Sequence, residues 1–134
     1  LKIMATLGTK LQLNIAAGGL TNDSINISTS KNLTVTAQLG GVVAVKATSA
    51  GSSATIIYTA DDFAAPAYLF LQNKDTTSSD FIFIYDDTTS GDPVIAKLAG
   101  GDFAFLPLNA DKTLRAYATT NPTNLEYAIF GTDQ

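Results

Sequence analysis

Acidic side chains gather in one stretch of this sequence, and their oxygen atoms are the ligands that calcium prefers. The carboxylates concerned are Asp75, Asp80, Asp86, Asp87 and Asp92. Calcium takes about six to eight oxygen ligands, which loops between strands can supply. The ligand order of an EF-hand is absent, however, and aspartate is also a common turn residue. Both a calcium site and solvated turns fit this pattern. We expect turns and no bound metal.

A second candidate for chemistry is Glu126, the single glutamate of the chain. Glycosidases use two carboxyl groups about 5 to 10 Å apart, one of them a general acid. Glu126 also fits a solvent-facing strand residue, since it alternates with Leu125 and Tyr127. No nucleophile elbow, P-loop or dinucleotide-binding motif is present in the sequence. We therefore expect a protein that is not an enzyme, with no catalytic residue and no cofactor.

Aromatic side chains recur along the apolar runs and have two interpretations. The residues are Phe63, Tyr68, Phe70, Phe81, Phe83, Tyr85, Phe103 and Phe105. Exposed rings would form a face that binds a sugar or another ligand, whereas buried rings would fill the core. Because these rings alternate inside the segments expected to form the core, we expect them to be buried.

Composition excludes several classes of function. The 134 residues include no Cys, His or Trp, so zinc, haem, iron–sulfur and thiol chemistry lack their usual ligands. The net charge is −4 and there is no cluster of Lys and Arg, which argues against nucleic acid and anionic membranes as partners. No apolar run approaches the roughly 20 residues of a membrane span. We expect a soluble chain.

Two features near the N-terminus have simple explanations. Met4-Ala5-Thr6 resembles a translation start, so Leu1-Lys2-Ile3 either lies upstream of the usual start or was exposed by cleavage of a precursor. Asn-x-Ser/Thr sequons occur at Asn22, Asn26 and Asn32, but they matter only in a eukaryotic secretory setting.

Turn residues divide the chain into short apolar runs, which is typical of strands. We expect strands at 9–17, 24–30, 33–39, 42–48, 54–59, 67–73, 80–86, 94–98, 102–106, 114–119 and 125–130. About ten short strands at this spacing predict an all-β, antiparallel two-sheet sandwich, jelly-roll-like in connectivity. We expect one sandwich domain over residues 9–134, preceded by an N-terminal arm at 1–8.

Local patterns add finer expectations. The run 9–17 alternates as a half-buried strand with Leu11, Leu13 and Ile15 on one side and a solvent-facing side opposite. Gly18-Gly19, Lys31-Asn32 and Gly40-Gly41 are expected to interrupt the chain. A single helical turn would fit within 60–66. Runs 67–73 and 80–86 are expected to pair as a hairpin and, being almost continuously apolar, to be covered on both faces.

The C-terminal half carries a family resemblance. Its motifs are YLFLQNK from Tyr68, FIFIY from Phe81, IAKLAGGDFAFLPL from Ile95, LRAYA from Leu114 and LEYAIFG from Leu125. Together they resemble the small β-sandwich virion proteins of tailed bacteriophages, chiefly head decoration (cement) proteins. The resemblance covers residues 67–131. Such proteins often have Gly-Glu before the aromatic pair, where this chain has Gly101-Asp102.

The resemblance implies a structural protein of the virion, located on the capsid surface. It would bind the outside of the major capsid protein shell as a trimer and stabilise the head. One alternative is a tail or fibre module that contacts the host surface, with a glycan as one candidate ligand and exposed aromatics as its mark. Another is a carbohydrate-binding or hydrolytic domain outside any virion. The sequence names no residue at a partner interface.

Overall fold

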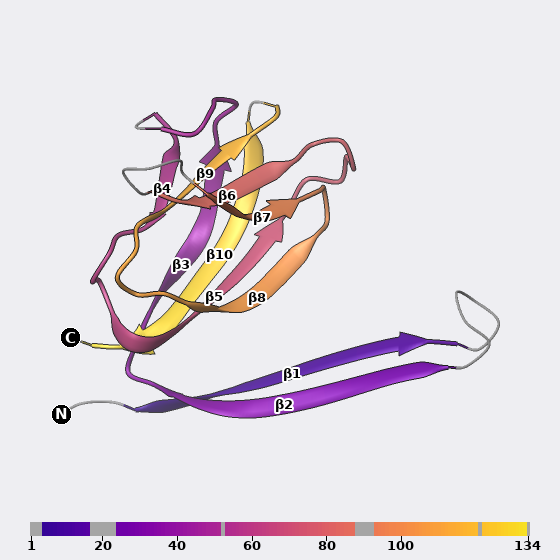
Figure 1. Cartoon of the computed structure of the whole chain (residues 1–134), viewed down its shortest axis with the longest axis vertical. Coiled ribbons are helices and arrows are strands. Elements are labelled where there is room, and N and C mark those ends of the chain that lie inside the picture. The colour runs from indigo at the N-terminus through magenta and orange to yellow at the C-terminus, as the bar shows by residue number, and fades with distance from the viewer. Residues whose placement is uncertain (1–3, 17–23, 52, 88–92, 121, 134) are drawn as a thin grey trace. The chain divides into compact units, whose positions relative to one another are not determined.

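The computed structural model describes residues 4–16, 24–51, 53–87, 93–120 and 122–133, and in these ranges every regular element is a β-strand (Figure 1). The strands are β1 (Ala5–Ile15), β2 (Ile25–Val35), β3 (Ala37–Val45), β4 (Thr55–Tyr58), β5 (Ala64–Asn73), β6 (Ile82–Asp86), β7 (Val94–Leu98), β8 (Phe103–Leu108), β9 (Leu114–Ala118) and β10 (Thr123–Thr132). All ladders between these strands are antiparallel. The predicted all-β antiparallel class with about ten strands is confirmed.

The chain forms two compact units, residues 1–36 and residues 37–134. The first unit contains β1 and β2, and the second contains β3 to β10. β1 begins at Ala5, inside the segment 1–8 for which an N-terminal arm was expected.

β1 and β2 form a two-stranded hairpin, here called the ribbon, whose strands are paired from end to end. The register places odd-numbered residues of both strands on one face and even-numbered residues on the other. Cross-strand pairs on the odd face are Ala5–Val35, Leu7–Leu33, Thr9–Lys31, Leu11–Thr29, Leu13–Ile27 and Ile15–Ile25. The even face carries polar residues and Gly8. The ribbon therefore has one apolar and one polar face.

Two expectations for this segment are wrong. Lys31 and Asn32 form no turn, because β1 continues the ladder past them and the hydroxyl of Thr9 donates a hydrogen bond of 2.7 Å to the carbonyl of Lys31. Leu11 and Leu13 are not on a buried side: they are 46% and 50% exposed. A two-stranded ribbon supplies no second layer of its own to cover them. The expected Gly18-Gly19 turn lies outside the described residues.

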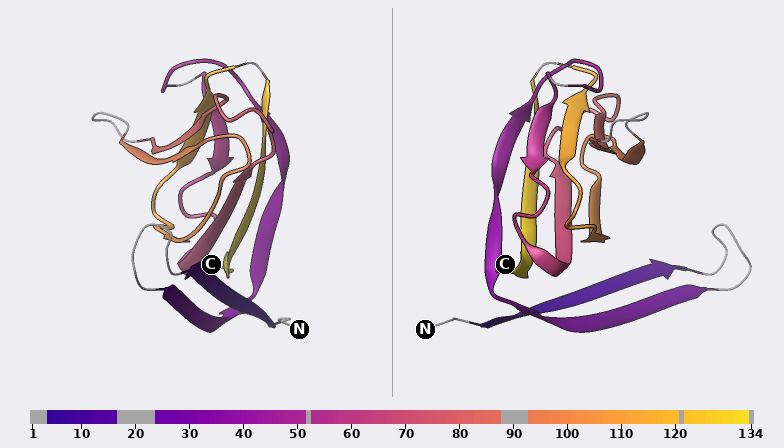
Figure 2. Two further views of the ribbon diagram at one scale, coloured as in Figure 1. Left: turned by 90° about the vertical axis from the view of Figure 1, so that its right-hand side faces the viewer. Right: turned by 60° about the vertical axis from the view of Figure 1, so that its left-hand side comes forward.

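Residues 37–134 fold into two four-stranded sheets with the orders β3-β10-β5-β8 and β4-β9-β6-β7. The sheets lie face to face (Figure 2). The first and last strands of this unit are neighbours, and most consecutive strands belong to different sheets. This is the strand order of an eight-stranded jelly roll. The predicted two-sheet, jelly-roll-like sandwich is confirmed.

The pair Gly40-Gly41 does not break the chain as expected. Both glycines lie inside β3, opposite Ala128 and Tyr127 of β10. The ladder with β10 runs from Ala37 to Val45, so the pairing of the backbone outweighs the low strand propensity of glycine.

The core lies between the two sheets and is filled by alternate residues of their strands. Its fully buried members include Leu69, Leu71, Leu125 and Ile129 from one sheet, and Ile82, Ile84 and Ala116 from the other. β5 and β6 were expected to be covered on both faces, but they alternate in burial. Tyr68 and Phe70, for example, are half-buried beside the buried Leu69.

The expected hairpin between residues 67–73 and 80–86 is wrong. β5 pairs with β8 and β10, whereas β6 pairs with β7 and β9 in the other sheet. The chain crosses between sheets at Asn73, whose side chain is fully buried. Its amide Nδ2 donates to the carbonyls of Asp80 (2.8 Å) and Leu98 (3.1 Å), and its Oδ1 accepts from the backbone N–H of Asp75 (3.0 Å). Local turn chemistry predicted the bend but not the change of sheet.

The connection between β4 and β5 contains no helical turn. Asp61 has φ of 64°, a left-handed value that ends any helix, and its N–H donates to the carbonyl of Ala110 (2.8 Å). β5 already begins at Ala64. The helical turn expected within 60–66 is therefore wrong.

Replacing Asn73 tests whether this crossing holds the sheets together. We expect Asn73→Ala to lower the free energy of unfolding by about 2–5 kcal/mol, because it leaves buried carbonyl and N–H groups without partners. Urea denaturation measures the change. Asn124→Ala, at an exposed position of β10, is the control and should stay within about 0.5 kcal/mol of the parent. Equal effects of the two substitutions would contradict this role of Asn73.

Candidate functional site

The outer side of the β3-β10-β5-β8 sheet carries an apolar surface, here called the aromatic face. Cross-strand pairing arranges its residues in rows that run over all four strands of the sheet. The rows are Gln38–Phe130–Tyr68–Pro107, Gly40–Ala128–Phe70–Phe105 and Val42–Glu126–Gln72–Phe103. These residues alternate along each strand with neighbours that point toward the core. The same strands that build the core thus also build this surface.

Several apolar side chains of the aromatic face are open to solvent. Phe103 is 66% exposed, Val42 63% and Phe105 44%. The rings of Tyr68 and Phe105 lie parallel, with centroids 6.0 Å apart and planes 2° apart. Offset-parallel packing of this kind holds an aromatic pair in a fixed orientation. The face therefore presents rigid rings.

A shallow hollow of about 540 Å³ lies where this face passes over β3 and β10. Gly40 and Ala128 contribute little side-chain volume to it, and Gln38, Val42 and Phe130 are among the residues around them. Glu126 adds a carboxylate, which lies 3.3 Å from Nζ of Lys74 in a half-exposed ion pair. The hollow is open to solvent, and its lining mixes apolar and polar groups.

The expectation that the aromatic residues are buried holds only in part. Phe63 and Tyr85 are buried at 8% and 0% exposure, whereas Phe103 and Phe105 are exposed, and for these two the expectation is wrong. The other members, Tyr68, Phe70, Phe81 and Phe83, are half-buried. In a strand with a period of two, rings at alternate positions share one face, and the apolar type of a residue does not reveal which face is inside.

The acidic residues considered for calcium do not come together as a metal site would require. Within the described ranges, no group of three or more Asp, Glu, His or Cys residues is placed to hold a metal. Asp75 Oδ1 accepts from the N–H of Thr77 (3.0 Å) in a turn. Asp87 pairs with Arg115, Asp80 precedes β6, and Asp86 is the last residue of β6. Asp92 lies outside the described residues.

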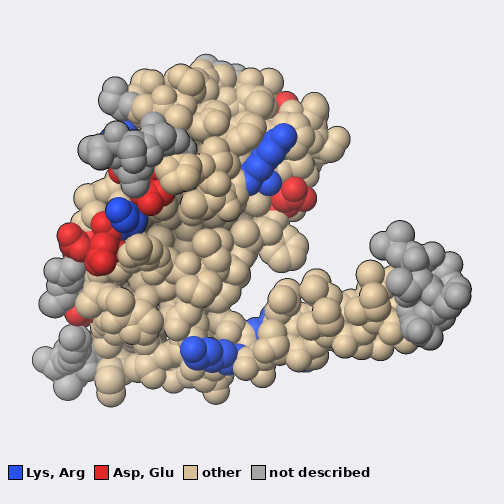
Figure 3. All heavy atoms as spheres, in the orientation of Figure 1, with Lys and Arg blue, Asp and Glu red and all other residues tan. Residues whose placement is uncertain are grey.

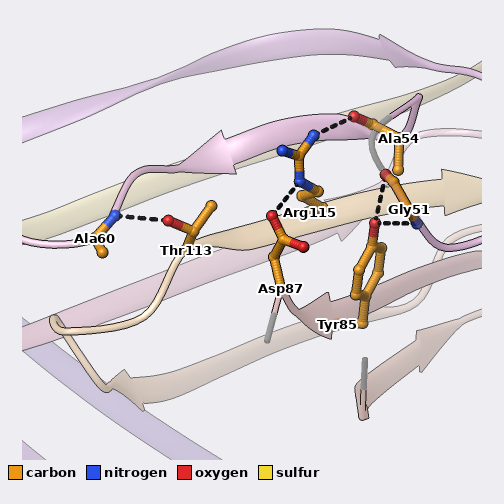
Figure 4. Close-up of polar contacts among 7 residues, drawn as sticks. All are labelled: Gly51, Ala54, Ala60, Tyr85, Asp87, Thr113 and Arg115. Atoms are coloured by element: carbon orange, nitrogen blue, oxygen red, sulfur yellow. Dashed lines mark hydrogen bonds and ion pairs between the residues drawn. The ribbon is translucent and has the colours of Figure 1, made fainter. Parts of the chain in front are cut away.

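Arg115 and Tyr85 secure the loop that connects β3 to β4 (Figure 4). Arg115 Nε donates to Asp87 Oδ2 at 2.6 Å, and its NH1 donates to the carbonyl of Ala54 at 3.1 Å. The hydroxyl of Tyr85 accepts from the N–H of Gly51 (2.8 Å) and donates to its carbonyl (3.0 Å). These partners make both side chains structural.

The outer side of the other sheet also carries rings, but with a cation above them. Phe83 and Tyr117 stack with centroids 4.9 Å apart. Lys97 Nζ lies 4.1 Å from the ring centroid of Phe81 and 5.4 Å from that of Phe83, within the range of a cation–π interaction. These rings are half-buried, whereas Ile56 and Ile95 of the same sheet are 50% and 45% exposed.

The sequence interpretation did not name Gln38, Val42 or Phe130 as part of a surface. Residues 37–45 alternate as a strand does, and this pattern could have indicated the surface. The Gly-Gly pair was instead interpreted as an interruption of the chain. Of the sequons, Asn26 and Asn32 lie at exposed positions of β2, and Asn22 is outside the described residues.

Comparison with protein-family models, curated proteins and solved structures found no match to this chain. In the described part of the chain, no helix has the length and apolarity needed to cross a bilayer. The site must therefore be interpreted from its own geometry.

The glycine pair beneath the hollow offers a matched test of the β3–β10 contact. A Cβ added to Gly40 would lie 2.5 Å from the carbonyl oxygen of Tyr127, whereas one added to Gly41 meets nothing within 4 Å. We expect Gly40→Ala to lower the free energy of unfolding by about 1–3 kcal/mol and Gly41→Ala to change it by less than about 0.5 kcal/mol. Urea denaturation of both variants checks this, and an equal effect would refute the close approach.

Tyr58 is a buried tyrosine that makes the stability of the sandwich depend on pH. Burial raises the pKa of its hydroxyl above the usual 10.0; a hydrogen bond from the N–H of Phe63 opposes this, and nearby aspartates add to it. The hydroxyl also donates to the carbonyl of Ala110 at 3.1 Å. Because the folded state holds this proton more tightly than the unfolded state, stability is retained below pH 10 and falls as pH rises above it.

We expect Tyr58→Phe to be less stable than the parent at pH 7 by about 1 kcal/mol, since hydrogen bonds are lost. The difference should shrink as pH rises from about 9 to 11, because only the parent must keep this hydroxyl protonated. Urea denaturation across this range measures both proteins. A difference that stays constant would show that Tyr58 does not contribute to the alkaline loss of stability.

Proposed function

We propose that the chain is a structural protein of a tailed-phage virion that decorates the outer surface of the major capsid protein shell and stabilises the head. The observation that carries the proposal is the aromatic face, an open apolar surface on a rigid sandwich. The resemblance of residues 67–131 to decoration proteins supports the same role. An adhesive role also agrees with the positions of Asp75 in a turn and of Glu126 and Asp87 in ion pairs.

The chain has the physical properties that a decoration protein needs. Each copy needs only modest affinity, because many copies on one shell act together. Burial of apolar surface supplies about 25 cal/mol per Å², and the exposed Val42, Phe103 and Phe105 provide such surface. A sandwich with a continuous core keeps these residues in place without ordering them on binding, which lowers the entropic cost of association.

Binding to heads and copy number test the proposal. The purified chain should bind expanded phage heads that lack it, saturate at a fixed high copy number set by the capsid lattice, and raise the temperature at which the heads break open. Quantitative mass spectrometry of virions and thermal disruption of heads measure both effects. Bovine serum albumin at equal concentration is the control. Absence of saturable binding, or only a few copies per virion, would overturn the proposal.

A second candidate is a tail or fibre module that contacts the host surface. The exposure of Phe103 and Phe105, at 66% and 44%, favours it, because flat faces with exposed rings stack on apolar faces of sugars. This candidate is supported if the copy number is low and Phe105→Ala abolishes binding to a host glycan.

A further inference from the structure

The apolar face of the ribbon is buried at the end that carries Leu33 and Val35, which are 4% and 6% exposed, and it is open at the other end. Leu11, Leu13, Ile25 and Ile27 lie on this face and are 46%, 50%, 37% and 48% exposed. An isolated two-stranded hairpin is at best marginally stable in water, because it has no core of its own. The apolar face therefore requires a second surface against which it can pack.

The aromatic face is a second uncovered surface of the same chain, and it matches the ribbon in size. The rows of this face extend from Tyr68 to Gln72 along β5, about 14 Å at the rise of a strand. On the ribbon, the stretch from Leu11 to Ile15 has the same number of residues and the same length. The two strands of the ribbon can thus cover two neighbouring strands of the sheet, such as β5 and β8.

Charge distinguishes among the possible partners of the ribbon. Residues 1–36 contain three lysines and one aspartate, whereas residues 37–134 contain five basic and eleven acidic residues. Figure 3 shows basic side chains on the ribbon and acidic ones gathered on the sandwich. Lys31 lies on the apolar face of the ribbon, whereas Glu126 of the aromatic face already pairs with Lys74, so the complementarity lies in the overall charge of the two units. These charges favour ribbon on sandwich over ribbon on ribbon.

We propose that the apolar face of the ribbon packs on the aromatic face of a second copy of this chain. The contact joins two different surfaces, so it forms a pair that exchanges ribbons, a closed ring or, where the rotation does not close, an open filament. It concerns contacts between copies and uses the β5 and β8 strands of the aromatic face, so it leaves the hollow over β3 and β10, with the exposed Val42, for the proposed capsid contact. It also explains the exposed rings of the aromatic face without a glycan, since the second copy covers them.

Two double variants test the two surfaces. Leu13→Thr with Ile27→Thr changes the apolar face of the ribbon, and Phe103→Thr with Phe105→Thr changes the aromatic face; threonine retains strand propensity. Each should weaken self-association by roughly 100-fold. The control pair Gln12→Thr with Ser28→Thr lies opposite on the polar face of the ribbon and should leave association unchanged. Sedimentation velocity measures assembly, and circular dichroism measures folding.

Mixing identifies which surfaces meet. The ribbon variant retains an intact aromatic face, and the aromatic-face variant retains an intact ribbon. An equimolar mixture should therefore form one-to-one dimers although each variant alone is monomeric. A monomeric parent, an unaffected double variant or a mixture that stays monomeric would overturn the proposal. Persistent assembly of the aromatic-face variant alone would also overturn it, because the ribbons would then contact each other.

Cysteine cross-linking provides a second readout if a double variant fails to fold. The chain has no cysteine, so Leu13→Cys and Phe105→Cys in separate chains report on this contact alone. Mixed and oxidised, they should form a disulfide-linked heterodimer, whereas Gln12→Cys with Phe105→Cys should not. A chain carrying both Leu13→Cys and Phe105→Cys should form linked multimers. A monomer with an internal disulfide would overturn the proposal, because the ribbon would then pack on the sandwich of its own chain.

Discussion

The position of β10 between β3 and β5 is the constraint on which the jelly roll depends. This strand pairs residues near the end of the chain with residues 37–45 on one side and 64–73 on the other. Such distant pairing cannot form until the loops between the strands close, so the sheet must assemble cooperatively. One strand then serves two surfaces: Leu125 and Ile129 enter the core, while Glu126, Ala128 and Phe130 contribute to the aromatic face.

Because side chains alternate along a strand, the residues that stabilise the core are not the residues that can bind a partner. In β5, Leu69 and Leu71 are fully buried while Tyr68 and Phe70 face outward. A substitution on the outer face can therefore change binding while leaving the core in place. The ribbon has the same alternation, and the part of its apolar side that carries Leu11, Leu13, Ile25 and Ile27 is exposed. Both exposed surfaces result from the alternation of side chains along a strand. In the sandwich a second sheet covers one side of each strand, whereas the ribbon has no second sheet in its own unit.

Much of the fold was predictable because turn residues and apolar runs are local. The loop at Gly100-Gly101 and the strands beside it were predicted, and Gly100 is indeed held tightly, since a Cβ there would lie 2.3 Å from the carbonyl of Thr77. Local signals failed at Lys31-Asn32 and Gly40-Gly41, where a neighbouring strand holds the backbone extended. They failed again after Asn73, where a bend suited to a hairpin carries the chain into the other sheet.

By itself, the sequence determined the class of structure: many short antiparallel strands in a chain without the usual groups for metal, thiol or imidazole chemistry. These properties depend on composition and on a period of two, which each segment carries alone. The tertiary structure decided which apolar side chains are buried, because that depends on which strands become neighbours. Leu71 and Phe105 lie on adjacent strands in similar apolar runs, yet one is fully buried and the other is 44% exposed. Only the pairing of distant strands separates core from surface.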